Sequence, residues 1–97
     1  MYDERPVELA PQSVAELAVD PGWKVTRAGT TGHWLTAERV IEREGGNWLI
    51  GLTPVRPGVV ALILWFDGEV VENLRDTEAE TCATAYRWVK QFLSGNR

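Results

Sequence analysis

The sequence from Val59 to Val71 reads VVALILWFDGEVV, and this stretch decides the fold class. Eight apolar residues run from Val59 to Phe66 without a break, whereas a membrane-spanning helix needs about 20. The run is rich in β-branched and aromatic residues and is bounded by glycine and by Asp67-Gly68, which is typical of a strand in a sheet core. Asp-Gly between two apolar runs is also a strong hairpin signal, so we expect residues 59–66 to pair antiparallel with 69–74.

Upstream of this hairpin, residues 33–43 predict a longer strand whose alternation changes phase. Most of its apolar residues occupy one parity, but Trp34 and Val40 occupy the other. A bulge, or a helical start around 36–43, is the alternative that explains the change.

Residues 23–28 alternate with strand period, and a glycine-containing turn joins them to the long strand. On the other side of the long strand, a hairpin turn with two glycines leads to the next strand, 48–52. The segment 53–58 is predicted to be a loop, because its two prolines remove ladder donors and fix φ. The predicted sheet covers residues 23–75, with strands at 23–28, 33–43, 48–52, 59–66 and 69–74.

Two capping boxes predict helices at the two ends of the sheet. Ser13 with Glu16, and Thr77 with Glu80, have the spacing in which both side chains satisfy free backbone donors of a first turn. They predict helices over 14–20 and 78–94, after an N-terminal arm at 1–12. The apolar face predicted for the second helix centres on Ala79, Cys82, Tyr86, Val89 and Leu93. Ala85 and Phe92 widen it on one side, with Trp88 at the far margin of that side.

The 97 residues therefore predict one α+β domain (1–97). It is an antiparallel meander of four to five strands with a short N-terminal helix and a C-terminal helix packed on one face. The net charge of −4 argues against a nucleic-acid binder and against an anionic membrane surface. The single cysteine excludes an intramolecular disulfide, and the acidic N-terminus lacks the apolar core of a secretory signal. We expect a cytoplasmic protein with no membrane association.

The residue types that carry catalysis lack the patterns that catalysis requires. His33 follows a Gly-Thr-Thr-Gly turn without the spacing of a phosphate-binding loop, and it has no Cys or His neighbour at zinc-ligand spacing. Cys82 is expected in the core. Interleaved arginines favour a solvated strand over a catalytic carboxylate pair for Glu38, Glu42 and Glu44. We expect no enzyme activity, no metal and no cofactor.

Five tryptophans in 97 residues are a heavy load. Trp23 and Trp65 are expected in the core, whereas the remaining three are candidates for an interface, where tryptophan and arginine often supply binding energy. Filling a thin core is the alternative use of tryptophan in a small domain. The predicted partner-binding residues are Trp34, Trp48, Arg56 and Trp88.

These observations favour a small acidic protein that binds a protein partner without catalysis, such as an adaptor, an inhibitor, or an immunity or mobile-element accessory protein. A homodimer through a sheet edge is an alternative form of that binding. A second hypothesis is a nucleic-acid-binding regulator that uses the sheet with Arg27, Arg39 and Arg43. A small-ligand binder or enzyme is the third.

Overall fold

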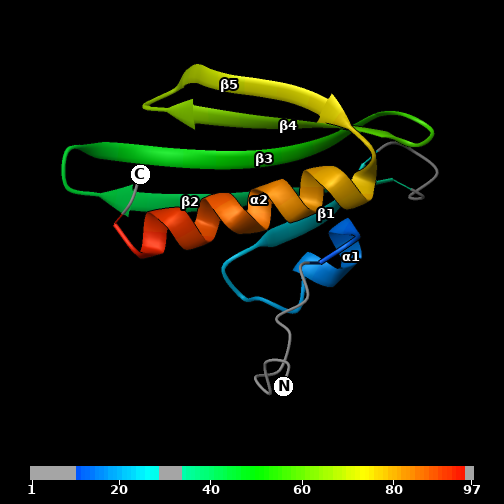
Figure 1. Ribbon diagram of the computed structural model, residues 1–97, viewed down its shortest axis with the longest axis horizontal. Helices are drawn as coiled ribbons and strands as arrows, with labels where there is room; N and C mark the ends of the chain where they lie inside the picture. Colours follow the sequence, from blue (N-terminus) through cyan, green and yellow to red (C-terminus); the bar gives the residue numbers. More distant parts are fainter. Residues whose placement is uncertain (1–10, 29–33, 96–97) are drawn as a thin grey trace, which may run out of the picture.

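The computed structural model describes residues 11–28 and 34–95. Five strands form one antiparallel sheet in the order β1-β2-β3-β4-β5, and both helices lie against it (Figure 1). This architecture confirms the predicted single α+β domain with its meander, its short N-terminal helix and its packed C-terminal helix. The elements in chain order are α1 (Val14–Leu17), β1 (Lys24–Ala28), β2 (Trp34–Arg43), β3 (Gly46–Arg56), β4 (Val59–Phe66), β5 (Glu69–Asp76) and α2 (Glu78–Leu93).

The hairpin between β4 and β5 forms where the Asp-Gly signal predicts it. Asp67 and Gly68 both have positive φ, +48° and +88°, as a tight two-residue hairpin turn requires. The register pairs Phe66 with Glu69 and shifts by a bulge between Leu64 and Trp65.

The loop predicted at 53–58 is wrong, because β3 continues as a strand to Arg56. Leu52 is the last β3 residue that pairs with β2, whereas pairing with β4 continues through Pro54. Pro54 therefore lies where β3 has become an edge strand, and an edge tolerates a residue without an N–H. The turn is confined to Pro57 and Gly58.

The strand β2 is continuous, so neither the bulge nor the helical start is correct. Its register with β1 and with β3 runs without a shift. The change of phase has another cause: Ala37 and Ile41 are buried under the helices, whereas Val40 lies on the opposite face of the sheet and is exposed.

Both helices begin at the predicted caps. The Ser13 and Thr77 hydroxyls accept hydrogen bonds from the backbone N–H groups of Glu16 and Glu80. The first helix is shorter than the predicted 14–20 and ends at Leu17. The second spans nearly the predicted 78–94, and Gly95 follows it with a φ of +82°.

The buried face of α2 is rotated from the predicted one. Trp88 is only 6% exposed, whereas Leu93 is 69% exposed. Because aromatic rings bury more apolar area than leucine, the orientation that covers Trp88 and Phe92 is the favourable one. The buried residues of α2 are Thr81, Cys82, Ala85, Trp88, Val89 and Phe92.

Candidate functional site

The sheet has two unlike faces. The face covered by the helices, here the inner face, carries the alternate residues of each strand, such as fully buried Leu62 and Leu64 of β4. Their neighbours Ile63 and Trp65 lie on the outer face and are half-buried. Within the described ranges, no helix covers the outer face.

Four large apolar residues form a continuous line across the outer face. The registers pair Val40 of β2 with Leu49 of β3, Leu49 with Trp65 of β4, and Trp65 with Val70 of β5. Directly opposed side chains on one face of a sheet contact each other, so these four residues form one patch, the apolar row. Val40 is 62% exposed and Val70 is 57% exposed. The row is therefore accessible to solvent at both ends.

The Trp65 ring extends from β4 over the backbone of β3, where Gly51 leaves room for it. A Cβ atom placed on Gly51 would lie 2.8 Å from Cζ3 of Trp65, closer than two carbon atoms can approach. Gly51 pairs in register with Ile63, which continues the apolar surface beyond the row. The absence of a side chain at Gly51 thus leaves room for the indole against the backbone of β3.

Beside the apolar row, toward the hairpin turns, lies a line of acidic and amide side chains. Glu42 pairs in register with Asn47. The Asn47 N–H donates to Oδ1 of Asp67 at 2.9 Å, and the Asp67 N–H donates to the Asn47 carbonyl. The Asp67 carboxylate thus takes the place of a backbone carbonyl as the acceptor for the Asn47 N–H at the end of the strand pair. We call Glu42, Asn47 and Asp67 the acidic row.

A shallow groove of about 470 Å³ lies where the two rows meet. Its lining is mainly apolar, with polar groups from Asn47 and Asp67 at one end. The apolar row contributes Val40, Leu49 and Trp65 to it. Such a groove can accept an apolar group together with a polar or cationic one.

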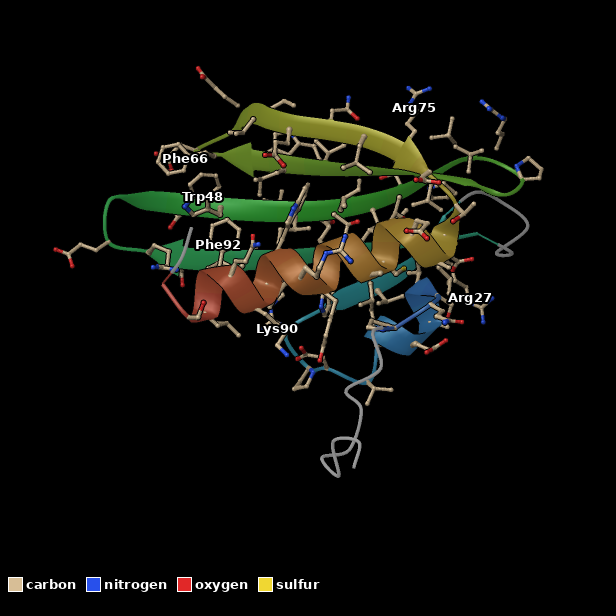
Figure 2. The ribbon with its side chains drawn as sticks, in the orientation of Figure 1. Arg27, Trp48, Phe66, Arg75, Lys90 and Phe92 are labelled. Carbon is tan, nitrogen blue, oxygen red and sulfur yellow. The ribbon has the colours of Figure 1, made fainter. Side chains whose placement is uncertain are left out.

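Of the predicted partner-binding tryptophans, Trp88 lies in the core, whereas Trp48 packs against the core and also lines the groove. Trp88 is a buried residue of α2 that faces the sheet. The half-buried Trp48 packs its ring 5.0 Å from Phe92 of α2 and 4.6 Å from Phe66, centroid to centroid (Figure 2). Trp23 is buried as predicted. The prediction that Trp65 belongs to the core is wrong, because it lies on the outer face.

Trp34 and Arg56 complete the predicted set. The backbone of Trp34 pairs with Ala28, and the Trp34 side chain lies outside the described atoms. Arg56 is exposed at the end of β3 and lines a groove of about 280 Å³ with Pro54 and Glu78. Oε2 of Glu78 accepts a hydrogen bond from the Val14 N–H at 2.7 Å. The structure therefore does not gather the four predicted residues into one site.

The arginines of the nucleic-acid hypothesis do not form a platform on the outer face. Arg39 lies 2.6 Å from Asp20, Nη1 to Oδ2, and Arg43 donates to the Phe92 carbonyl of α2. The pKa of Asp20 is lowered by the Gly22 N–H hydrogen bond and by Arg39. Arg27 pairs in register with Leu35, which packs against the core. Arg39 and Arg43 thus connect β2 to the helical layer.

The remaining candidates for chemistry are Cys82, clusters of metal-ligating side chains and His33. Cys82 is fully buried, and burial, followed by the charges of Glu78 and Glu16, raises its pKa to about 12, which keeps the thiol protonated. No cluster of metal-ligating side chains is present among residues 11–28 and 34–95. His33 and the turn before it lie outside the described residues. Within the described part of the chain, no helix is long and apolar enough to cross a membrane.

Sequence reasoning missed the outer face, although two signals for it were present. Val40 breaks the parity of β2, and Trp65 has the parity opposite to Leu62 and Leu64. Both signals indicate apolar residues on the second face of the sheet.

No family model, curated protein or solved structure matches this chain.

Proposed function

We propose that this chain is a non-catalytic, cytoplasmic protein-binding module that docks a protein partner on its outer sheet face. The observation that carries the proposal is the apolar row, a solvent-accessible line of large apolar side chains across four strands. The solvated face of an antiparallel sheet is usually polar, so a line of this kind is typical of an interface.

The packing of the inner face supports this assignment. The helices already cover that face, and every deeply buried side-chain polar atom of the described residues has a hydrogen-bond partner. The core cluster contains none of the four residues of the apolar row. Covering them would gain roughly 25 cal/mol for each Å² of apolar area removed from water.

The nucleic-acid alternative receives less support. Arg39 and Arg43 are engaged with Asp20 and with α2, away from the open face. The outer face instead carries exposed Glu38 and Glu42, which would repel phosphates.

The test is an affinity capture that compares three baits: the wild type, a variant of the apolar row and a control variant. The double variant Val40→Thr/Val70→Thr keeps β-branched residues in the strands but makes both ends of the apolar row polar. The control Val19→Thr changes an exposed valine outside the sheet. All three baits are exposed to native lysate with and without nuclease, and bound proteins are quantified by mass spectrometry.

The proposal predicts that one protein is recovered in stoichiometric amount with the wild type and with the control, both with and without nuclease. Its recovery on the double variant should be at least about tenfold lower. Equal recovery on all three baits would show that the outer face is not the binding surface. Recovery that disappears with nuclease would favour the nucleic-acid alternative.

A further inference from the structure

The charges around the outer face are unevenly placed. Glu42 and Asp67 lie beside the apolar row at the end of the sheet where the β2–β3 and β4–β5 turns are located (Figure 1). The described basic residues of this face lie elsewhere. Lys24 pairs with Glu38, and Arg75 pairs with Ala61 toward the opposite end of the strands (Figure 2).

The groove lies between the acidic row and the apolar row, because residues of both rows line it. Trp48, Leu49 and Trp65 line it together with Asp67, which lies in the β4–β5 turn. Oδ1 of Asp67 accepts the Asn47 N–H, but an ionised carboxylate has two oxygens and can accept several more hydrogen bonds. A lysine or arginine lying along Trp65 would place its alkyl stem on the indole and its cationic end beside Asp67 and Glu42.

We propose that the partner is a protein surface in which lysine or arginine flanks an apolar patch, and that this cationic side chain occupies the groove between the apolar row and the acidic row. The inference rests on the proposed function of the outer face and adds the chemistry of its partner. Charge complementarity selects this occupant over a second copy of the chain. On the outer face Glu38, Glu42 and Asp67 outnumber Lys24 and Arg75, and the whole chain carries −4, so two copies would repel on balance.

The test uses defined peptides as probes. One is an amphipathic helical peptide of leucine and lysine, and the second has glutamate at every lysine position. Each is titrated into the ¹⁵N-labelled full chain while backbone and indole N–H signals are followed by NMR, at low and high salt. We expect the leucine–lysine peptide to shift signals of the apolar row and to bind at least about tenfold more tightly than the glutamate peptide, with a difference that shrinks in salt.

Matched variants separate local charge from total charge. Glu42→Gln/Asp67→Asn removes two charges beside the groove. Asparagine retains the Oδ1 acceptor for the Asn47 N–H and tolerates the positive φ at this position. Glu69→Gln/Glu80→Gln removes two exposed carboxylates outside the acidic row. We expect the first variant to weaken binding of the leucine–lysine peptide by about fivefold or more and the second by less than about twofold.

The outcomes distinguish this inference from the proposed function. If Trp65→Ala abolishes peptide binding but the two charge variants behave alike, the outer face is a docking surface and the basic partner is wrong. If the leucine–lysine peptide shifts signals elsewhere, or neither peptide binds, the basic partner is wrong, whereas the proposed function is decided by the affinity capture with the outer-face variant. A dimer detected by sedimentation and abolished by Val40→Thr/Val70→Thr would replace the basic partner with a second copy.

Discussion

The two faces of β4 are built from similar residues but have different surroundings. The inner residues Leu62 and Leu64 are fully buried beneath α2, whereas the outer residues Ile63 and Trp65 are half-buried and have only neighbouring side chains for cover. Both sets come from one uninterrupted apolar run. The comparison shows that an apolar residue in a central strand is not necessarily a core residue, because the second layer of the fold determines which face is shielded from water.

Because of this difference, substitutions on the two faces should have different main effects, on folding stability for the inner face and on partner binding for the outer face. Inner-face side chains lose nearly all contact with water on folding, so removing one leaves a cavity as well as lost transfer free energy. Outer-face side chains keep part of their exposure, and the surrounding solvent can fill any gap. We therefore expect substitutions on the inner face to unfold the protein and substitutions on the outer face to affect partner binding.

The largest expected effect is the contrast between two tryptophans. Trp88→Ala should lower the free energy of unfolding by about 3–5 kcal/mol, because it empties a buried site between α2 and the sheet. Trp65→Ala should cost about 1–2 kcal/mol, because the ring is half-exposed. Urea unfolding followed by circular dichroism measures both. Equal losses would show that the outer face contributes to the folded core as much as the inner face does.

Thiol reactivity compares solvent access to the two faces directly. Cys82 is fully buried on α2, and burial raises its pKa to about 12, so few thiolates form near pH 8. A cysteine placed on the outer face by Val70→Cys, in a Cys82→Ala background, should react with a disulfide reagent at least about 100-fold faster than native Cys82. Both proteins should react at similar rates in denaturant, which serves as the control. If the two cysteines react at similar rates in the folded proteins, the inner face is not shielded from solvent.

Gly51→Ala tests the packing of the outer face. The new Cβ would overlap the Trp65 ring at 2.8 Å, so the indole must move. We expect a loss of about 1–3 kcal/mol in the free energy of unfolding, measured by urea titration, since overpacking forces a side chain or backbone to shift. In a Trp65→Ala background the same substitution should cost much less. If the cost is unchanged, Gly51 has another role than making room for Trp65.

Local signals allowed most of the fold to be predicted from the sequence. Asp67-Gly68 identified the last hairpin, and Ser13 and Thr77 identified the starts of both helices, because each depends on chemistry within a few residues. The end of β3 was missed because Pro54 is acceptable only where β2 no longer pairs, and this depends on another strand. The orientation of α2 was predicted only in part, because the helical period defines a stripe but not which large residue at its edge, Trp88 or Leu93, the sheet accepts.

The candidate site was harder to predict, because a binding surface depends on what remains uncovered after folding. Trp88, predicted at the interface, fills the core, and Trp65, assigned to the core, lies on the outer face. Parity within β4 separates Trp65 from Leu62 and Leu64. Deciding which parity faces α2 required the tertiary structure.

The smallest expected effect concerns a charged residue at an inner-face position. Arg39 pairs in register with Ile50, yet its guanidinium is covered by the chain around Gly22 and lies 2.6 Å from Asp20, Nη1 to Oδ2. The Gly22 N–H, together with Arg39, lowers the pKa of Asp20 below its ordinary 3.8. A carboxyl with a lowered folded pKa stabilises the protein above its unfolded pKa, and this contribution is lost as pH falls through the folded value.

Asp20→Asn should therefore lower stability near pH 7 by less than about 1 kcal/mol, since the carboxylate is half-exposed and screened. The difference from wild type should shrink at pH values well below 3.8 and in high salt. Urea unfolding of wild type, Asp20→Asn, Arg39→Met and the double variant measures the coupling between the two side chains. A coupling of several kcal/mol would mean that this pair is part of the dry inner face, because only desolvated charges interact so strongly. A small coupling would mean that solvent screens the pair, so that the water-excluded inner face ends on β2 at Arg39.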